Sequence, residues 1–184
     1  MITVPPYLKK GDTIGITCPS GYLDASRTKD CIRTLQSWGF EVMIGKTVGS
    51  NSKNYFSAPD EDKIDELQAM LNDPGINAIL FGRGGYGMGR IIDKLSFKKF
   101  KKNPKWLIGF SDITVFHHRL MKLGVQSIHG SMPLNFEKNS PEALETMIGI
   151  LRGENPQISC AGNEFNHLGE ANGTLIGGNL SIVF

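Results

Sequence analysis

The stretch Asn77-Ala-Ile-Leu-Phe-Gly-Arg-Gly-Gly-Tyr-Gly87 decides the fold class, because a short apolar run changes abruptly into a glycine-rich loop. A short apolar run bounded by turn residues is typical of a buried β-strand. After the loop, Met88, Ile91, Ile92 and Leu95 follow the i, i+3, i+4, i+7 spacing of an amphipathic helix. A strand, a tight loop and a helix in this order form one β–α unit of a parallel sheet.

The same alternation continues in both directions from this unit. The sequence predicts strands over residues 13–18, 40–44, 77–81, 106–110 and 125–129. It predicts helices over residues 25–38, 60–73, 88–95, 113–123 and 141–152, with residues 98–105 as a basic connection. The expected fold is therefore α/β, a mainly parallel, doubly wound, flavodoxin-like sheet with helices on both faces. Ligands in such folds bind beyond the carboxyl ends of the strands, which here are the junctions 18–21, 82–87 and 110–112.

The composition limits the class of protein. The chain has 184 residues, with 20 Lys+Arg, 18 Asp+Glu, a formal net charge of +2 and 40% hydrophobic residues. These values argue against a disordered chain and against a surface directed at polyanions, so no nucleic-acid partner is expected. Cys18, Cys31 and Cys160 are too few for a disulfide framework, and no signal peptide or membrane-spanning run is evident. We expect a cytoplasmic protein with no membrane partner and, because no metal-ligand spacing occurs, no metal or other cofactor.

The last part of the chain departs from the β–α alternation. Residues 153–172 form a polar connection, and residues 173–184 become apolar and stop without a cap, a charge or a helix breaker. An apolar segment needs a partner that buries it. We expect an N-terminal α/β nucleophile domain over residues 1–152, a linker over 153–172, and at 173–184 the beginning of a C-terminal domain that is missing. These apolar residues are also expected to make the chain self-associate, for example as a homodimer.

The junction Trp106-Leu-Ile-Gly-Phe-Ser-Asp-Ile-Thr114 places a serine between a predicted strand and a predicted helix. A serine on such a tight turn exposes its hydroxyl, and the amide N–H groups that follow lie at the positive end of the helix dipole. This geometry suits a nucleophile with half of an oxyanion hole. The G-x-S-x-G motif is incomplete, however, since Ile113 replaces its last glycine. A serine at this position, Ser111, is more often a helix cap, so both interpretations stay open.

A nucleophilic serine needs a general base, and none of the four histidines is a convincing candidate. His117 and His118 lie on the same predicted helix, about 9 to 10 Å from Ser111. His129 could reach the site from the end of its strand, although we expect a buried, hydrogen-bonded structural histidine there. His167 lies in the polar connection, and the sequence assigns it no fixed place.

The glycine-rich loop supports an alternative function. Gly82, Gly84 and Gly87 match the G-x-G-x-x-G pattern of dinucleotide binding, with a strand before them and a helix after them. The loop follows the third strand rather than the first, and Asp112 is only the nearest candidate for the acidic residue that reads the ribose. The same loop could instead bring backbone N–H groups beside the serine, or hold a substrate carboxylate with the help of Arg83. A non-catalytic module that holds a peptide in this cleft is a third interpretation.

Three further features favour a structural role over a chemical one. Gly45-Lys-Thr47 ends like a phosphate-binding Walker A loop, but Phe40 occupies the position of its first glycine and no helix follows. The lysines of residues 98–105 are more typical of a solvated face than of a phosphate site. Cys18 is best interpreted as a small buried residue.

Five motifs together resemble the LD-carboxypeptidase family, the serine peptidases that include the microcin immunity proteins. In chain order they are Leu8–Ile16 with Pro19-Ser-Gly21, Gly82–Gly87, Lys105–Thr114, Ile128-His-Gly130 and Gly173–Ser181. No single motif is specific, but five in this order over essentially the whole chain are.

The resemblance implies a hydrolase that cleaves an amide bond next to a D-amino acid. The typical reaction of the family releases the terminal D-alanine from murein tetrapeptides during cytoplasmic peptidoglycan recycling, and some members hydrolyse peptide-nucleotide antibiotics. The family takes the Glu and His of its Ser-Glu-His triad from a C-terminal domain. This chain is therefore expected to be an incomplete and inactive serine carboxypeptidase.

The resemblance also assigns roles to individual residues. It implies that Ser111 is the nucleophile and that the backbone amides of Asp112 and of Gly84 or Gly85 form the oxyanion hole. We further expect the small peptide substrate to contact Arg83 and Tyr86.

Overall fold

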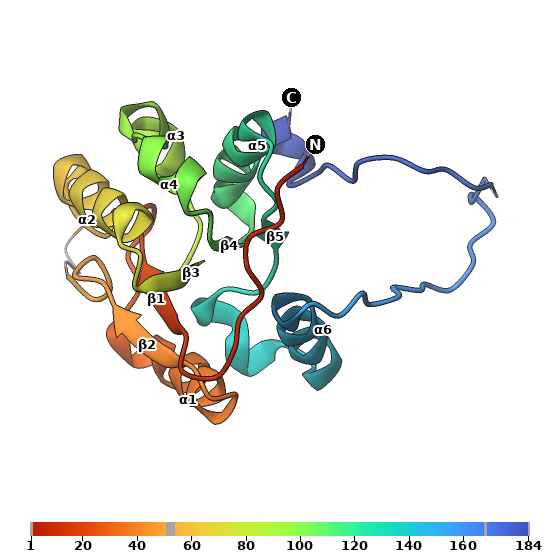
Figure 1. Cartoon of the computed structure of the whole chain (residues 1–184), viewed down its shortest axis with the longest axis horizontal. Coiled ribbons are helices and arrows are strands. Elements are labelled where there is room, and N and C mark those ends of the chain that lie inside the picture. Colours follow the sequence, from red (N-terminus) through yellow and green to blue (C-terminus); the bar gives the residue numbers. More distant parts are fainter. Residues whose placement is uncertain (1, 51–53, 168, 184) are drawn as a thin grey trace.

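The computed structural model describes residues 2–50, 54–167 and 169–183, and its centre is a five-stranded parallel sheet (Figure 1). The strands are β1 (Thr13–Thr17), β2 (Glu41–Ile44), β3 (Ile76–Phe81), β4 (Trp106–Gly109) and β5 (Ile128–His129). Their order in the sheet is β2-β1-β3-β4-β5, and every neighbouring pair is parallel. This is the flavodoxin-like order, so the predicted fold class is confirmed.

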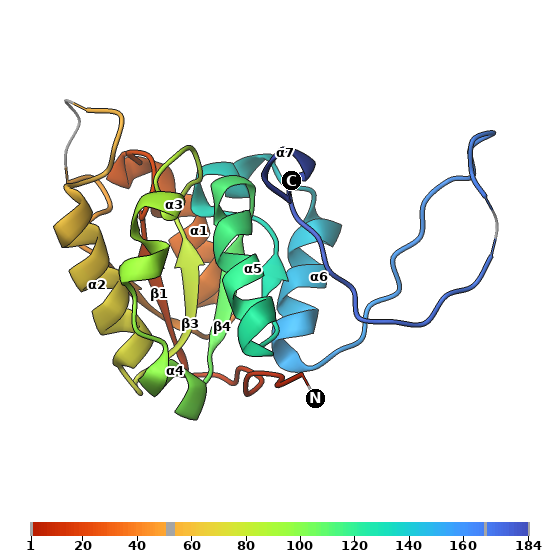
Figure 2. The same ribbon diagram turned by 90° about the horizontal axis from the view of Figure 1, so that it is seen from above.

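Helices cover both faces of the sheet (Figures 1 and 2). On one face, α1 (Lys29–Ser37) and α6 (Pro141–Arg152) pack against side chains such as Ile14 and Ile16 of β1. On the other face, α2 (Asp60–Asn72), α3 (Met88–Ile91), α4 (Lys98–Lys102) and α5 (Thr114–Leu123) enclose a second apolar cluster. Four short 3₁₀ helices, η1 (Ala25–Thr28), η2 (Ile92–Lys94), η3 (Ser111–Ile113) and η4 (Pro133–Lys138), and the terminal α7 (Leu180–Val183) complete the described elements. The two apolar clusters arise because successive strand residues point to opposite faces.

The predicted helix signals act as expected at several ends. The Asp24 carboxylate accepts a hydrogen bond from the Ser26 amide before η1, and the Ser140 hydroxyl accepts one from the Ala143 amide at the start of α6. Gly124 and Gly153 close α5 and α6 with φ of +71° and +94°, in the left-handed region where glycine has no steric penalty. These local rules explain why the helix boundaries could be predicted closely.

The predicted basic connection over residues 98–105 is wrong in part, because Lys98–Lys102 forms α4. Phe97 and Phe100 are buried and anchor this short helix, while its four lysines are exposed. Lys105 is not part of a solvated face. It is buried, and its ammonium donates hydrogen bonds to the carbonyls of Met70 and Asp73 at the carboxyl end of α2. These carbonyls have no partner inside the helix, so the lysine acts as a buried helix cap.

Residues 154–179 contain no helix or strand among those described, and they form the long excursion at one side of Figure 1. Leu175 is 98% exposed and Ile158 is 86% exposed. The chain then returns to the sheet, where α7 contacts α5. Within the described residues, no helix is both long and apolar enough to cross a membrane.

Candidate active site

Ser111 lies on a sharp turn at the carboxyl end of β4. Its φ is +62°, and among the described residues it is the only non-glycine residue with positive φ. This left-handed conformation costs a residue with a Cβ about 1 kcal/mol or more, and such strain is concentrated at functional sites. No hydrogen bond in the described part of the chain uses the Ser111 hydroxyl, so it does not cap the following helix. Ser111 is half-buried, and the geometry therefore argues against a helix-cap role.

The glycine-rich loop packs directly against this serine. A Cβ built on Gly84 would lie 3.0 Å from the Ser111 Cβ, 3.2 Å from its Oγ and 3.4 Å from the Asp112 nitrogen. The Gly84 carbonyl accepts a hydrogen bond of 3.2 Å from the Gly21 amide, which ties the loop to the carboxyl end of β1. Gly85, with φ of +113°, follows. The three junctions singled out in the sequence, 18–21, 82–87 and 110–112, thus meet at one place, as the switch-point rule predicts.

The side chain of Asp112 holds these three junctions together. Asp112 is 5% exposed, and its carboxylate accepts hydrogen bonds from the Ser20 hydroxyl at 2.6 Å and from the Met88 amide at 2.8 Å. The sequence suggested Asp112 as a backbone amide donor or, in the dinucleotide interpretation, as the acid that reads the ribose, and it did not predict this contact. The occupied Met88 amide also weakens the dinucleotide interpretation, because a bound phosphate would need the N–H groups at the start of α3.

Arg83 and Tyr86 flank the loop in different ways. Arg83 is half-buried, and its Nη1 donates a hydrogen bond of 2.7 Å to the carbonyl of Tyr22 in the loop after β1. One nitrogen of the guanidinium is therefore already hydrogen-bonded within the protein. Tyr86 is 57% exposed and packs at a tilt against Phe56, with ring centroids 6.4 Å apart. Contact of either residue with a substrate stays a prediction.

The histidines do not complete the site within the described residues. His117 is buried, and its Nε2 lies 2.8 Å from the Gly109 carbonyl, so this nitrogen carries the proton and donates it. Its Nδ1 therefore accepts from the Ser127 hydroxyl at 2.7 Å. Burial, with smaller contributions from His129 and His118, lowers the pKa of His117 to about 4, although the hydrogen bond to the Gly109 carbonyl acts in the opposite direction. His117 is thus a neutral residue that fixes the end of β4 just before the serine.

None of the remaining histidines forms a hydrogen bond with Ser111 among the described residues. His129 is exposed and lies against the rings of His117 and Phe110, so the expectation of a buried structural histidine at 129 is wrong. The buried histidine is the one on α5 instead. His167 is exposed in the long connection. No hydrogen bond among the described residues joins the Ser111 hydroxyl to a histidine.

Asn179 is a contact that sequence reasoning missed. Its side-chain Oδ1 accepts a hydrogen bond of 3.2 Å from the backbone amide of Ser111, and its backbone amide donates one of 3.0 Å to the Thr114 hydroxyl. A Cβ on Gly178 would collide with the Thr114 side chain, so glycine is needed where this segment crosses the start of α5. The adjacent glycines at 177 and 178 were the only sequence signal for this close approach.

Other candidate motifs have structural roles. The Thr47 amide and hydroxyl both donate to the Glu66 carboxylate, at 3.0 and 2.6 Å, so the Gly45-Lys-Thr47 turn already holds an internal anion. Cys18 is buried, and burial raises the pKa of its thiol to about 12. No group of three or more metal-ligating side chains occurs in the described part of the chain.

This is an α/β protein with a strained serine between a parallel strand and a helix and a glycine loop against the serine hydroxyl, a geometry that resembles a nucleophile elbow. Residues 14–130 match the family model described as "LD-carboxypeptidase N-terminal domain", and the chain belongs to this family.

Known proteins agree with this assignment. A Bacillus subtilis protein named "Probable murein peptide carboxypeptidase" is 29% identical over 191 residues, which cover 97% of this chain and 58% of the relative. The solved structure of the microcin C7 self-immunity protein MccF with aspartyl sulfamoyl adenosine is 26% identical, with a TM-score of 0.73 over 85% of this chain and 48% of that one. The muramoyltetrapeptide carboxypeptidase of Oxalobacter formigenes is 29% identical, with a TM-score of 0.66 over 75% of this chain and 47% of that one. The chain thus spans about half the length of each of these relatives.

Proposed function

We propose that this chain carries the nucleophile of a serine carboxypeptidase of the LD-carboxypeptidase type. The proposed reaction is hydrolysis of the amide bond before a terminal D-amino acid, such as the D-alanine of a murein tetrapeptide. The names of the murein-peptide relatives support the substrate class. The observation that carries the proposal is the strained Ser111 turn with Gly84 packed against its hydroxyl.

In the proposed mechanism, the Ser111 Oγ attacks the scissile carbonyl carbon and its proton passes to a general base. The amide N–H groups of Asp112 and of Gly84 or Gly85 stabilise the oxyanion. The C–N bond then breaks, the leaving amine takes the proton, and water hydrolyses the acyl-enzyme. The clamp formed by the Asp112 carboxylate supports this assignment, because it fixes the glycine loop relative to the serine. Arg83 and Tyr86 are the proposed substrate contacts at the rim.

The general base is proposed to come from outside the described residues. A C-terminal domain that begins near residue 173 would supply the Glu and His of the triad, after a linker over residues 153–172. Two observations support this proposal. The relatives are longer than this chain, and the segment before α7 already returns to Ser111 through Asn179. We also propose a cytoplasmic location, which the free thiols of Cys18, Cys31 and Cys160 support.

The test compares the 184-residue chain with a form extended by the region that the longer relatives carry after the matching segment. Each form is incubated with a murein tetrapeptide, and free D-alanine is measured by mass spectrometry. We expect release only by the extended form, abolished by Ser111→Ala and unchanged by Ser37→Ala, which alters an exposed serine on α1.

Release by the 184-residue chain alone would refute the missing-base proposal. An extended form that stays active as Ser111→Ala would refute the nucleophile. Saturable binding of NAD that Gly84→Val abolishes would support the dinucleotide interpretation instead.

A further inference from the structure

The end strand β2 presents unpaired backbone groups. In the described part of the chain, β1 is the only strand that pairs with β2. The amides of Glu41 and Gly45 donate to carbonyls of the β1 segment, Asp12 at 3.0 Å and Ile16 at 2.8 Å. Successive strand residues direct their N–H and C=O groups to opposite sides, so Val42 and Ile44 direct theirs to the open edge. Such an edge is a template for another strand.

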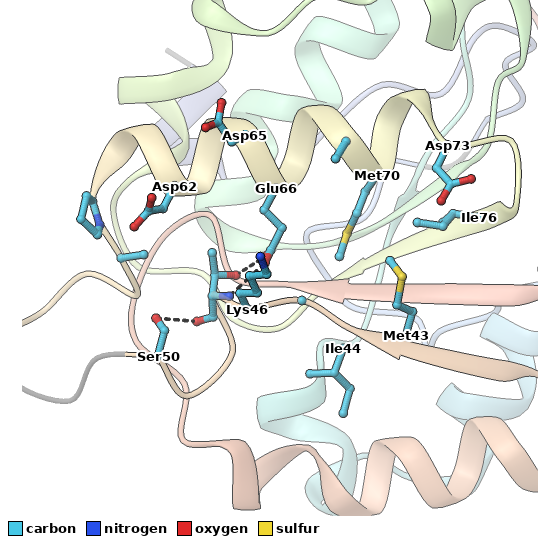
Figure 3. Close-up of a pocket in the computed structure, with 15 residues that line it drawn as sticks. Met43, Ile44, Lys46, Ser50, Asp62, Asp65, Glu66, Met70, Asp73 and Ile76 are labelled. Atoms are coloured by element: carbon cyan, nitrogen blue, oxygen red, sulfur yellow. Dashed lines mark hydrogen bonds between the residues drawn. The ribbon is translucent and has the colours of Figure 1, made fainter.

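An apolar groove of about 740 Å³ lies between this strand and α2 (Figure 3). Met43 projects from β2, and Met70 and Ile76 lie opposite it. A Cβ on Gly15 would lie 3.3 Å from the Met70 Sδ, so the absence of a side chain at 15 lets Met70 pack on the sheet. Met43 is 38% exposed, whereas strands of parallel sheets are usually covered on both faces. The groove is therefore an uncovered part of an otherwise buried sheet.

The rim of the groove is anionic on a chain whose net charge is +2. Asp62 and Asp73 are exposed at opposite ends of α2, about 16 Å apart along the helix axis, and Lys46 is the cation among the lining residues. Neither aspartate takes part in an ion pair among the described residues. Asp65, by contrast, points away from the strands in Figure 3.

We propose that this groove binds an extended, cationic peptide segment that adds to the sheet as a strand beside β2. Backbone hydrogen bonds to Val42 and Ile44 would hold the segment, as in other cases of strand addition. A strand of five or six residues spans about 16 to 20 Å, which matches the separation of Asp62 and Asp73. Alternate side chains of the bound segment would face α2. Two of them would be cationic, one near each end of the segment, and the apolar side chain between them would pack on Met43. Ser111 follows β4, and β1 and β3 separate that strand from β2, so the surface is independent of the proposed catalysis.

The test uses the whole 184-residue chain and two capped hexapeptides, Lys-Thr-Val-Thr-Lys-Thr and its counterpart with glutamate at both lysine positions. Binding is measured by fluorescence anisotropy and by backbone amide NMR. We expect the lysine peptide to bind saturably and to shift the amide signals of Val42 and Ile44. We expect the glutamate peptide to bind at least about tenfold more weakly than the lysine peptide. We also expect 0.5 M salt to lower the affinity for the lysine peptide.

Three variants locate the binding. Asp62→Asn should weaken binding of the lysine peptide about threefold, while the matched control Glu61→Gln, at an exposed acid on the same helix that does not line the groove, should leave its affinity unchanged. Ile44→Pro removes the N–H group that faces the open edge of β2 and leaves the hydrogen bonds between β2 and β1 intact. It should therefore abolish peptide binding without changing the circular dichroism spectrum.

Equal binding of the two peptides, equal effects of Asp62→Asn and Glu61→Gln, or full binding by a folded Ile44→Pro variant would each overturn the proposal. A dimer in sedimentation with protected Val42 and Ile44 amides would also overturn it, because a second copy would then occupy the edge.

Discussion

Lowering the pH from 7 to 5 should remove about 2 kcal/mol from the free energy of unfolding through one residue, His117. Its pKa is about 4 in the folded chain against an ordinary value of 6.5, because the ring is buried. The unfolded chain therefore binds more protons in this range, and stability falls as the pH falls. The full difference is about 3 kcal/mol and is reached below pH 4. The neutral ring also matches its contacts, since Nε2–H donates to Gly109 and Nδ1 accepts from Ser127.

The assay is urea unfolding at pH 5, 6, 7 and 8, followed by tryptophan fluorescence and circular dichroism. The wild type should lose stability steadily below pH 6.5. His117→Gln keeps a donor for the Gly109 carbonyl but does not titrate, so its stability should change little between pH 7 and pH 5. The control His118→Gln alters the neighbouring, half-buried histidine and should keep the wild-type slope. Equal slopes for the wild type and His117→Gln would refute the reasoning.

Three other predictions follow from the packing around the site. Gly84→Ala should leave the chain folded but crowd the serine hydroxyl, and it should lower D-alanine release by the extended form more than about a hundredfold, because small misplacements at a reacting group have large effects. Ser20→Ala and Asp112→Asn should be coupled by about 1 kcal/mol or more in a double-mutant cycle of urea unfolding, since the two side chains share a buried hydrogen bond. Lys105→Met should destabilise the chain by about 1 to 3 kcal/mol in the same assay, because it leaves the Met70 carbonyl unpaired and removes one of the two donors to the Asp73 carbonyl, while the exposed control Lys101→Met should have little effect.

Each of these has a distinct contrary result. An active Gly84→Ala variant would show that the loop moves away from the serine. Additive effects of Ser20→Ala and Asp112→Asn would show that the clamp contributes no stability. Equal stabilities of the two lysine variants would show that water replaces the ammonium of Lys105 as the helix cap.

Local signals explain how much of the fold could be predicted from the sequence. Apolar periodicity predicted the element types. The ends of several helices were predicted from the caps Asp24 and Ser140 and from the glycines at 124 and 153. The alternation of strand, loop and helix predicted the parallel sheet. The short α4 was missed because five residues, four of them lysines, show no clear period, and only tertiary burial of Phe100 stabilises the helix. The burial of Lys105 was missed for a similar reason, since its partners are carbonyls more than 30 positions away.

The candidate site was predictable where the topology rule applied and not where it depended on side-chain contacts. The rule brought together the junctions at 18–21, 82–87 and 110–112. It could not show that the Asp112 carboxylate joins Ser20 to Met88, because these partners are 92 and 24 positions away. It also could not show that Asn179 reaches Ser111, since the described residues of the 154–179 segment, which leads to that contact, have no regular structure.

The backbone at residue 111 has a consequence for the history of the chain. A left-handed φ is easiest for glycine, so folding alone would favour glycine at this position, and Ser111→Gly is expected to make the molecule more robust to heat. Where the hydroxyl is not needed, substitution of the serine by glycine would relieve the backbone strain. Under the proposed mechanism, a serine that persists at this position indicates selection for catalysis rather than for stability.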